Sequence, residues 1–183
     1  LPVCLPKTAW PPTLAGIMPV WSSEIEPFAI RVTEKRLPQV QHFGNISGLH
    51  GAKLPSVDII TFGSPCQDMS IAGKRTGLNG SRSSLFHEAI RIIREMRCAS
   101  NGKYPRYIVW ENVPGAFSSN GGEDFCCVLE AICSVKDSSI SIPRPAGKWT
   151  KAGEILAESY SLAWRVLDAQ YWCTRTVPSP FVS

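Results

Sequence analysis

The sequence predicts an α/β protein with a mostly parallel sheet flanked by helices. Buried strands are indicated by two short apolar stretches rich in β-branched and aromatic residues, 57–62 and 107–111. Apolar residues at helical spacing indicate helices over 25–37 and from about residue 84. A chain of 183 residues can form one such domain with a substantial core. Adjacent parallel strands bring their carboxyl ends to one edge of a sheet, where α/β proteins bind ligands.

The N-terminal third contains two further predicted strands and the first helix. Residues 1–13 hold four prolines, which forbid a helix and argue against a central strand. A strand is predicted over 17–22, followed by the helix at 25–37 and a short strand over 40–46. One face of this helix is apolar and consists of Ile25, Phe28, Ala29 and Val32.

Two further helices are predicted after the strand at 57–62. Ser83 or Ser84 is suited to cap an amphipathic helix, which Asn101-Gly102 ends. A Gly/Ser loop is predicted over 116–122 and a second helix over 123–134. The apolar face of the first of these helices consists of Leu85, Phe86, Ala89, Ile90, Ile93 and Met96.

The C-terminal part is less regular. Residues 138–153 carry Pro, Gly and Ser and indicate an exposed insertion. A strand is predicted over 160–171, and residues 173–183 form an atypical tail. Because no signal peptide or long apolar run is present, we expect a cytoplasmic protein.

A cysteine follows the strand at 57–62 almost at once. Gly63-Ser64-Pro65 stops the strand, and the chain then presents Cys66 at the sheet edge where ligands bind. An isolated cysteine is more often a small buried hydrophobe. Here, however, the other clear strand ends in Glu111, and a nucleophile beside a carboxyl group indicates acid-assisted nucleophilic chemistry.

Two stretches resemble the catalytic motifs of a known enzyme family. Gly63 to Gln67 and Glu111 to Val113 look like those of the DNA (cytosine-5) methyltransferases of bacteria and phages. Residues 73–77 and 81–86 resemble the loop and the helix start that lie between the two motifs in this family. The order and the spacing fit over residues 14–172.

The resemblance implies a fold and a reaction. The fold would be the Rossmann-like fold of S-adenosyl-L-methionine-dependent methyltransferases, with residues 1–183 as a single partial catalytic domain that is incomplete at both ends. The reaction would be that of a DNA (cytosine-5-)-methyltransferase, as found in restriction–modification systems. Cys66 would attack C6 of a cytosine flipped out of double-stranded DNA, and protonated Glu111 would stabilise the charge that develops at N3.

The resemblance also implies a set of residues that bind S-adenosyl-L-methionine. An acid at the end of the second strand binds ribose hydroxyls in Rossmann-like folds; Glu24 occupies that position, with Ile25 beside it to pack on the adenine. The alternative for such an acid is a helix N-terminal residue that favours the macrodipole. Asn45 is suited equally to bind the adenine amino group and to form a turn. The predicted cofactor-binding residues are Glu24, Ile25, Asn45, Ile46, Pro65 and Leu85.

The predicted DNA-binding residues lie mainly in the loop that follows Cys66. Lys74, Arg75 and Arg82 are suited to meet phosphates, although cations in a loop also serve solubility alone. The net charge of +4 permits DNA binding without requiring it. The remaining members of the set are Gln67, Ser70 and Asn112.

Both ends of the chain depart from the family's pattern. Residues 1–13 contain no glycine, whereas the family has a Gly-rich turn there that approaches S-adenosyl-L-methionine closely. Residues 173–180 replace the family's Gln-Arg-x-Arg segment, and no target-recognition domain follows. We therefore expect weak cofactor binding and no detectable methylation by this chain alone. A complementing C-terminal chain is a possible partner.

Two alternative functions stay open. The first is a non-catalytic truncated remnant or a weak DNA-binding module. The second is an unrelated cysteine hydrolase, which needs a histidine base, with His42, His50 and His87 as the candidates. The seven cysteines are not in paired spacing, so the sequence indicates no metal site.

Overall fold

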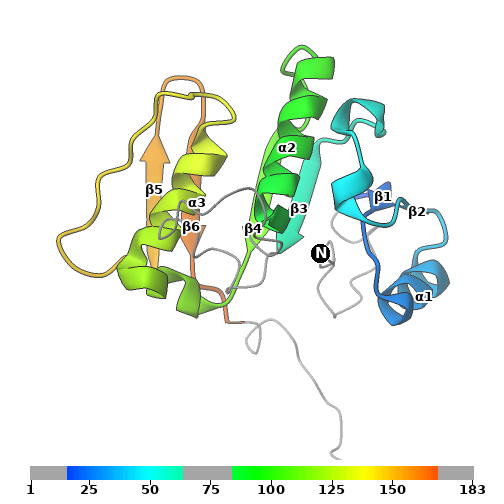
Figure 1. The fold of residues 1–183 in the computed structure, drawn as a ribbon, viewed down its shortest axis with the longest axis horizontal. Coiled ribbons are helices and arrows are strands. Elements are labelled where there is room, and N and C mark those ends of the chain that lie inside the picture. The colour runs from blue at the N-terminus through cyan, green and yellow to red at the C-terminus, as the bar shows by residue number, and fades with distance from the viewer. Residues whose placement is uncertain (1–15, 64–83, 169–183) are drawn as a thin grey trace, which may run out of the picture. The chain divides into compact units, whose positions relative to one another are not determined.

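The structure is a computed structural model that describes residues 16–63 and 84–168. The chain separates into two compact units that divide between Trp149 and Thr150. The first unit carries the predicted site residues and contains the strands β1 to β4 and the three α-helices (Figure 1). The second unit contains β5 and β6. The predicted single catalytic domain over 1–183 stays a prediction.

The first strand pair is shorter than predicted. β1 (Trp21–Ser22) runs parallel to β2 (Gln41–His42), so residues 17–20 and 43–46 lie outside strands, contrary to expectation. Pro19 has no N–H to donate to a ladder, which limits the strand on one side. Gly44 adopts a φ of 71°, which ends β2 and leads into a 3₁₀ turn over Ile46–Gly48.

Helix α1 (Pro27–Arg36) follows β1 and confirms the predicted helix. Pro27 stands in its first turn, where a missing N–H costs nothing. The predicted apolar face is not buried, however: no residue of α1 is buried, and Phe28 is 67% exposed. The spacing of apolar residues therefore predicted the helix correctly but did not predict whether its apolar face is buried.

The second strand pair confirms the central prediction about the sheet. β3 (Ile59–Gly63) and β4 (Tyr107–Glu111) are parallel neighbours, paired from Ile59 with Tyr107 to Gly63 with Glu111. The two faces of the pair differ because side chains alternate along a strand. Ile60 and Phe62 are buried, whereas Tyr107 and Val109 are exposed.

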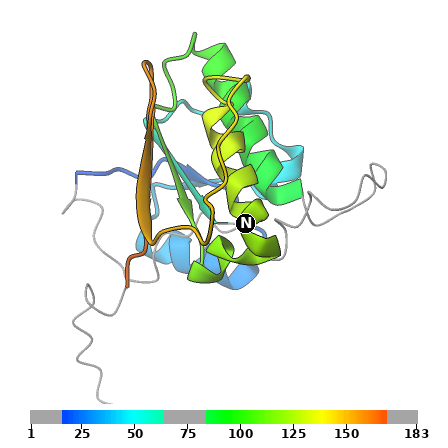
Figure 2. The same cartoon turned by 90° about the vertical axis from the view of Figure 1, so that its left-hand side faces the viewer.

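Helix α2 (Ser84–Ala99) covers the buried face of the β3–β4 pair (Figures 1 and 2). The Phe86 ring lies 5.8 Å from the Phe62 ring and 6.2 Å from the Trp110 ring, so this contact joins the helix to both strands. The turn after α2 places Asn101 and Gly102 in the left-handed region, as the predicted helix end requires. The buried residues of α2 are Phe86, Ala89, Ile90, Ile92, Ile93 and Met96.

Helix α3 (Glu123–Cys133) confirms the predicted helix over 123–134, but its surroundings differ from expectation. The predicted Gly/Ser loop is two 3₁₀ turns, Pro114–Phe117 and Ser119–Gly122. The segment after α3 is tied back to it, because the Trp149 indole N–H donates to the Gly122 carbonyl at 2.9 Å. The part of the predicted insertion that ends at Trp149 therefore belongs to the first unit.

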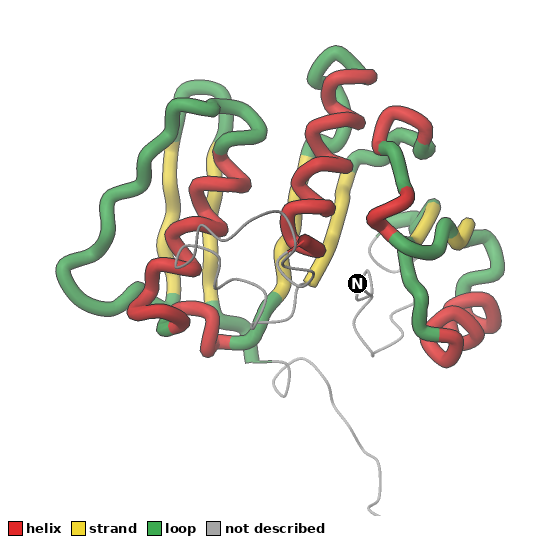
Figure 3. Tube along the Cα trace, viewed as in Figure 1, coloured by secondary structure: helices red, strands yellow, loops and turns green. Residues whose placement is uncertain are grey.

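The second unit is an antiparallel pair (Figure 3). β6 (Ser161–Arg165) lies within the predicted strand, whereas β5 (Ala152–Leu156) overlaps the predicted insertion and was not expected. A Cβ at Gly153 would lie 2.2 Å from the Trp164 ring, so only glycine leaves room for this ring to lie against β5.

The three sheets correct the predicted architecture. The described strands form two parallel pairs and one antiparallel pair, so the mostly parallel sheet is confirmed only in its local pairings. Among the helices of the described residues, none has the length and apolar character needed to cross a membrane.

Candidate active site

The carboxyl ends of β3 and β4 bring a carboxylate against a glycine. A Cβ added at Gly63 would lie 3.2 Å from Oε2 of Glu111, so this carboxylate stands directly over the last residue of β3. Glu111 is exposed, and its carboxylate takes part in no hydrogen bond or ion pair with another described residue. Within the part of the chain that the structure describes, only the backbone of β4 holds this acid group in place.

The predicted nucleophile belongs to the segment that continues from Gly63. Cys66 lies outside the described residues, as does Pro65, so its approach to Glu111 stays a prediction. Most of the predicted DNA-binding set also lies outside them, namely Gln67, Ser70, Lys74, Arg75 and Arg82.

Asn112 supports the backbone just beyond Glu111. Its Oδ1 accepts a hydrogen bond from the Val113 N–H at 2.8 Å, and the chain then enters the 3₁₀ turn over Pro114–Phe117. Asn112 is half-buried. This bond fixes the backbone at the point where the chain leaves the sheet after Glu111.

The carboxyl ends of β1 and β2 form a second polar cluster. The Ser23 hydroxyl donates to the Gly44 carbonyl at 2.7 Å, and Ser22 Oγ lies 2.8 Å from His42 Nδ1. Ser22, Ser23 and Glu24 are all buried. These side-chain bonds join the two strand ends where the backbone ladder has already stopped.

Glu24 is held by the backbone that follows it. Its Oε1 accepts from the Ile25 N–H at 2.7 Å and from the Glu26 N–H at 2.9 Å, just before α1 begins. These two N–H groups precede Pro27, the first residue of α1, and the first turn of the helix holds no acid, so the bonds fix the loop before the helix rather than its N-terminus. The contact with ribose stays a prediction, as does the packing of adenine on Ile25, which is 63% exposed.

Asn45 forms a turn, which was one of its two predicted roles. Its Oδ1 accepts from the Ser47 N–H at 3.0 Å and caps the 3₁₀ turn over Ile46–Gly48. Asn45 is exposed, and its predicted contact with the adenine amino group remains a prediction.

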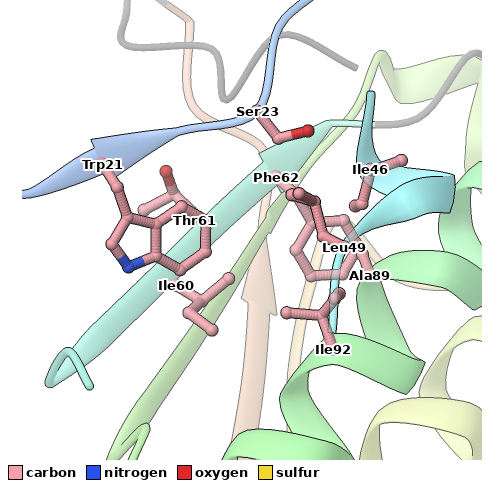
Figure 4. A pocket seen from close by; sticks show the side chains of 9 residues that line it. All are labelled: Trp21, Ser23, Ile46, Leu49, Ile60, Thr61, Phe62, Ala89 and Ile92. Atoms are coloured by element: carbon pink, nitrogen blue, oxygen red, sulfur yellow. The ribbon is translucent and has the colours of Figure 1, made fainter. Parts of the chain in front are cut away.

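A small apolar cavity lies between the two strand pairs. Its volume is about 20 Å³, room for roughly one water molecule and far below that of a cofactor pocket. Figure 4 shows the lining side chains, which come from β1 and the residue after it, from β3, from residues 46–49 and from α2. Ile46 is the one predicted cofactor-binding residue in this lining, and Ser23 is the neighbour of Glu24. Leu85 is half-buried in the first turn of α2, outside the lining.

Sequence reasoning missed the residues that hold the turn at 46–49. Arg91 on α2 donates to the Leu49 carbonyl at 2.9 Å and to the Ile46 carbonyl at 3.3 Å. The spacing of Glu88, Arg91 and Glu95 was a signal of charge pairs on one helix face. That spacing does not reveal the distant backbone carbonyls that Arg91 reaches.

The three histidines proposed as hydrolase bases differ in their surroundings, and Nε2 of His42 is buried without a hydrogen bond to a described residue. His42 contacts Ser22, and His50 lies 3.4 Å from a Glu95 oxygen. Burial and the charge of Arg94 lower the pKa of His87 below its usual value.

Burial and the nearby Glu130 carboxylate raise the pKa of the Cys126 thiol to about 11, so this cysteine is a protonated core residue at neutral pH.

Comparison with known proteins gives a consistent family. The profile of the C-5 cytosine-specific DNA methylases matches residues 12–135. The "DNA N-6-adenine-methyltransferase" of Escherichia phage P1 is 35% identical, over 90% of this chain and 24% of that protein. The type II methyltransferase M.NgoBV of Neisseria gonorrhoeae is 30% identical, over 82% of this chain and 30% of its own.

Other relatives match over shorter stretches. The orphan methyltransferase M.Rho11sI of Bacillus phage rho11s is 34% identical, over 62% of this chain and 22% of its own length. The chain thus spans less than a third of the length of these three relatives.

Proposed function

Because the chain belongs to the C-5 cytosine-specific DNA methylase family, we propose that it carries the catalytic cysteine and acid of a DNA (cytosine-5) methyltransferase. The observation that supports this most strongly is the register of β3 and β4, in which Gly63 stands opposite Glu111. Cys66 follows Gly63 by three residues, which span at most roughly 11 Å. The cysteine is therefore tethered to the sheet edge at which Glu111 stands.

The reaction begins at a carbon that is a poor nucleophile. The Cys66 thiolate adds to C6 of cytosine, and the electrons of the C5–C6 double bond make C5 nucleophilic. Protonated Glu111 donates a hydrogen bond to N3 and stabilises the charge that develops there. After C5 has gained its methyl group, a base removes the C5 proton, the double bond forms again and the S–C6 bond breaks to return the thiolate.

S-adenosyl-L-methionine is the methyl donor of this family and supplies C5 with an electrophilic methyl group. Glu24 fits the ribose because it is a buried carboxylate at the carboxyl end of β1. Oε1 of Glu24 is occupied by two backbone N–H groups, while Oε2 has no hydrogen bond within the described residues. Asn45 and Ile46 would contact the adenine from the turn after β2.

Double-stranded DNA is the proposed macromolecular substrate. A cytosine must leave the base stack before Cys66 can reach C6, and this flipping costs a few kcal/mol that DNA contacts offset. The proposed contacts come from Lys74, Arg75 and Arg82 to phosphates, with Gln67, Ser70 and Asn112 near the flipped base. A complementing chain that supplies further DNA contacts is part of the proposal.

Cytosine is preferred over adenine as the target base on chemical grounds. The exocyclic N6 of adenine carries its own lone pair, so its methylation needs no covalent thiol. The motif that combines Cys66 with Glu111 therefore supports cytosine. The adenine-specific name of the phage P1 relative describes a whole protein, of which the match covers 24%.

The test measures methyl incorporation from labelled S-adenosyl-L-methionine into mixed-sequence duplex DNA. The purified chain is assayed alone and together with a polypeptide that carries the rest of M.NgoBV, because the match covers 30% of that relative. We expect label on cytosine only in the combined assay. Cys66→Ala and Glu111→Gln should each abolish it.

Three results would overturn the proposal: label on adenine, label that survives Cys66→Ala, or no label in either assay. A third variant guards against a folding artefact. Cys98→Ala removes an exposed cysteine near the C-terminal end of α2 that belongs to neither motif, and should leave the incorporation unchanged.

A further inference from the structure

We infer that Arg91 is a positioning residue for the cofactor: it holds the turn that carries Asn45 and Ile46 in the shape that contacts adenine. The inference rests on the proposed function, because Asn45 and Ile46 are proposed adenine contacts. It extends that function to a residue on α2 that touches no proposed ligand.

The guanidinium of Arg91 reaches across to the turn through two backbone carbonyls. Nη1 donates to the Leu49 carbonyl at 2.9 Å and Nη2 donates to the Ile46 carbonyl at 3.3 Å. These carbonyls lie at the two ends of the 3₁₀ turn over Ile46–Gly48. A planar fork that binds both ends of a turn fixes its shape in a way that one flexible ammonium cannot.

The fork is itself held in place by two acids of the same helix. Glu88 Oε2 accepts from Nε at 2.9 Å and from Nη2, and both carboxylate oxygens of Glu95 accept from Nη1 at 2.8 and 3.0 Å. The Arg91 and Glu95 side chains are about a third and a quarter exposed, so the ion pairs are partly shielded from water. Such a network restricts the rotamers of Arg91 before any ligand is present.

Glu95 adds a second link to the same segment. Its Oε2 accepts from the Gly51 N–H at 2.6 Å, at the start of the 3₁₀ turn over Gly51–Lys53. The backbone approaches α2 very closely here, since a Cβ at Gly51 would lie 2.2 Å from the Ile92 carbonyl oxygen. The segment from Ile46 to Gly51 is thus fastened to α2 at three backbone groups.

The consequence is a fixed platform beside the cavity. Ile46 and Leu49 project into the cavity lining with Ala89 and Ile92 of α2 (Figure 4). The Asn45 Oδ1 bond to Ser47 sits on the same turn. If only a tenth of the molecules kept this turn, the apparent dissociation constant of a ligand that needs it would rise about tenfold.

The experiment is a protein-observed NMR titration with S-adenosylhomocysteine, which measures weak binding. The amide signals of Ser47, Gly48 and Gly51 report on the turn directly. Arg91→Met removes the fork while keeping most of the aliphatic stem. Arg94→Met is the matched control: it removes the same charge three residues further along α2, and Arg94 donates to Ser134 on the α3 side instead.

We expect Arg91→Met to weaken S-adenosylhomocysteine binding roughly tenfold and to shift the Ser47 amide, whereas Arg94→Met stays within about twofold. Arg91→Lys should fall between them, because an ammonium keeps the charge but does not bridge both carbonyls. Urea denaturation of each variant shows whether binding changes simply because the fold is lost. Should Arg91→Met fail to fold, the comparison of Arg91→Lys with wild type carries the test.

Two failures are distinguishable. Wild-type protein that shows no amide shifts at any ligand concentration would overturn the cofactor site itself, and the inference with it. Wild-type binding that is unchanged in Arg91→Met, or in Arg91→Lys when only that variant folds, would overturn the inference and leave the proposed function standing.

Discussion

Two acids stand at the carboxyl ends of parallel strands in the first unit, and they are held in opposite ways. Glu24, after β1, is buried and binds two backbone N–H groups. Glu111, the last residue of β4, is exposed, and its carboxylate has no hydrogen bond to a described residue. The first carboxylate is built into the fold, whereas the second stands ready for a ligand.

The difference follows from what supports each strand pair. β3 and β4 are paired over five residues each and rest on the buried face of α2. This scaffold can present an unsupported acid because its own stability comes from the core. β1 and β2 pair over only two residues each, so side-chain bonds such as those of Glu24 and Ser23 complete the strand ends.

The largest expected effect comes from breaking the scaffold of Glu111. Phe62→Ala should lower the free energy of unfolding by about 3–5 kcal/mol, because Phe62 is buried and its ring packs on Phe86. Urea denaturation measures this. Tyr107→Ala removes an aromatic ring from the exposed face of the same strand pair and should cost less than about 1 kcal/mol. Equal costs would show that α2 is not what holds the pair.

A smaller effect separates the two acids directly. Glu24→Ala should destabilise the protein by about 2 kcal/mol, because two backbone N–H groups lose a charged acceptor in a buried site. Glu111→Ala should change the free energy of unfolding by less than about 0.5 kcal/mol. The same urea titrations compare the two variants. If Glu111→Ala proved the more damaging, the contrast between a structural and a free acid would be wrong.

The bonds of Glu95 to Gly51 and Arg91 should make the stability of the protein depend on pH in the acid range. Burial tends to raise the pKa of the Glu95 carboxyl, but the hydrogen bond from Gly51 and the bonds and charge of Arg91 outweigh it, so the pKa is lowered. A pKa that is lower in the folded state gives stability above the unfolded pKa, and this stability is lost as the pH falls through the folded pKa.

Wild type should therefore lose more stability than Glu95→Gln between about pH 5 and pH 3. Thermal unfolding across this range measures the two slopes. Identical slopes would mean that Glu95 does not titrate differently in the folded and unfolded states. Glu34→Gln, on the exposed surface of α1, provides the control for removal of any one acid.

At Gly63 we expect a small effect on stability and a larger one on activity. A Cβ there would crowd Oε2 of Glu111 at 3.2 Å and its carbonyl oxygen at 3.4 Å. The exposed carboxylate can move away, so Gly63→Ala should change the free energy of unfolding by less than about 1 kcal/mol. Methyl incorporation in the combined assay should nevertheless fall roughly 10- to 100-fold, because the acid is displaced. Gly147→Ala is a matched control, since a Cβ there meets no atom within 4 Å and the residue belongs to neither proposed site.

Several features could be predicted from the sequence because they depend on local chemistry. Apolar stretches rich in β-branched and aromatic residues over 57–62 and 107–111 predicted two neighbouring parallel strands, and the structure confirms that pairing. Helical spacing predicted the buried face of α2, and Asn101-Gly102 predicted its end. The residues around Cys66 could be recognised as a resemblance to a catalytic motif, and the role of this cysteine stays a proposal.

Only the tertiary structure decided which groups are covered and which are free. Glu24 and Glu111 look alike in sequence, but Glu24 accepts two N–H groups of the loop that follows it, whereas the Glu111 carboxylate has no hydrogen bond to a described residue. The apolar face of α1 has the helical spacing that α2 also shows, yet it is exposed. The reach of Arg91 to the Ile46 and Leu49 carbonyls joins positions more than forty residues apart. Local pattern determines an element, whereas burial and distant hydrogen bonds depend on which other elements pack against it.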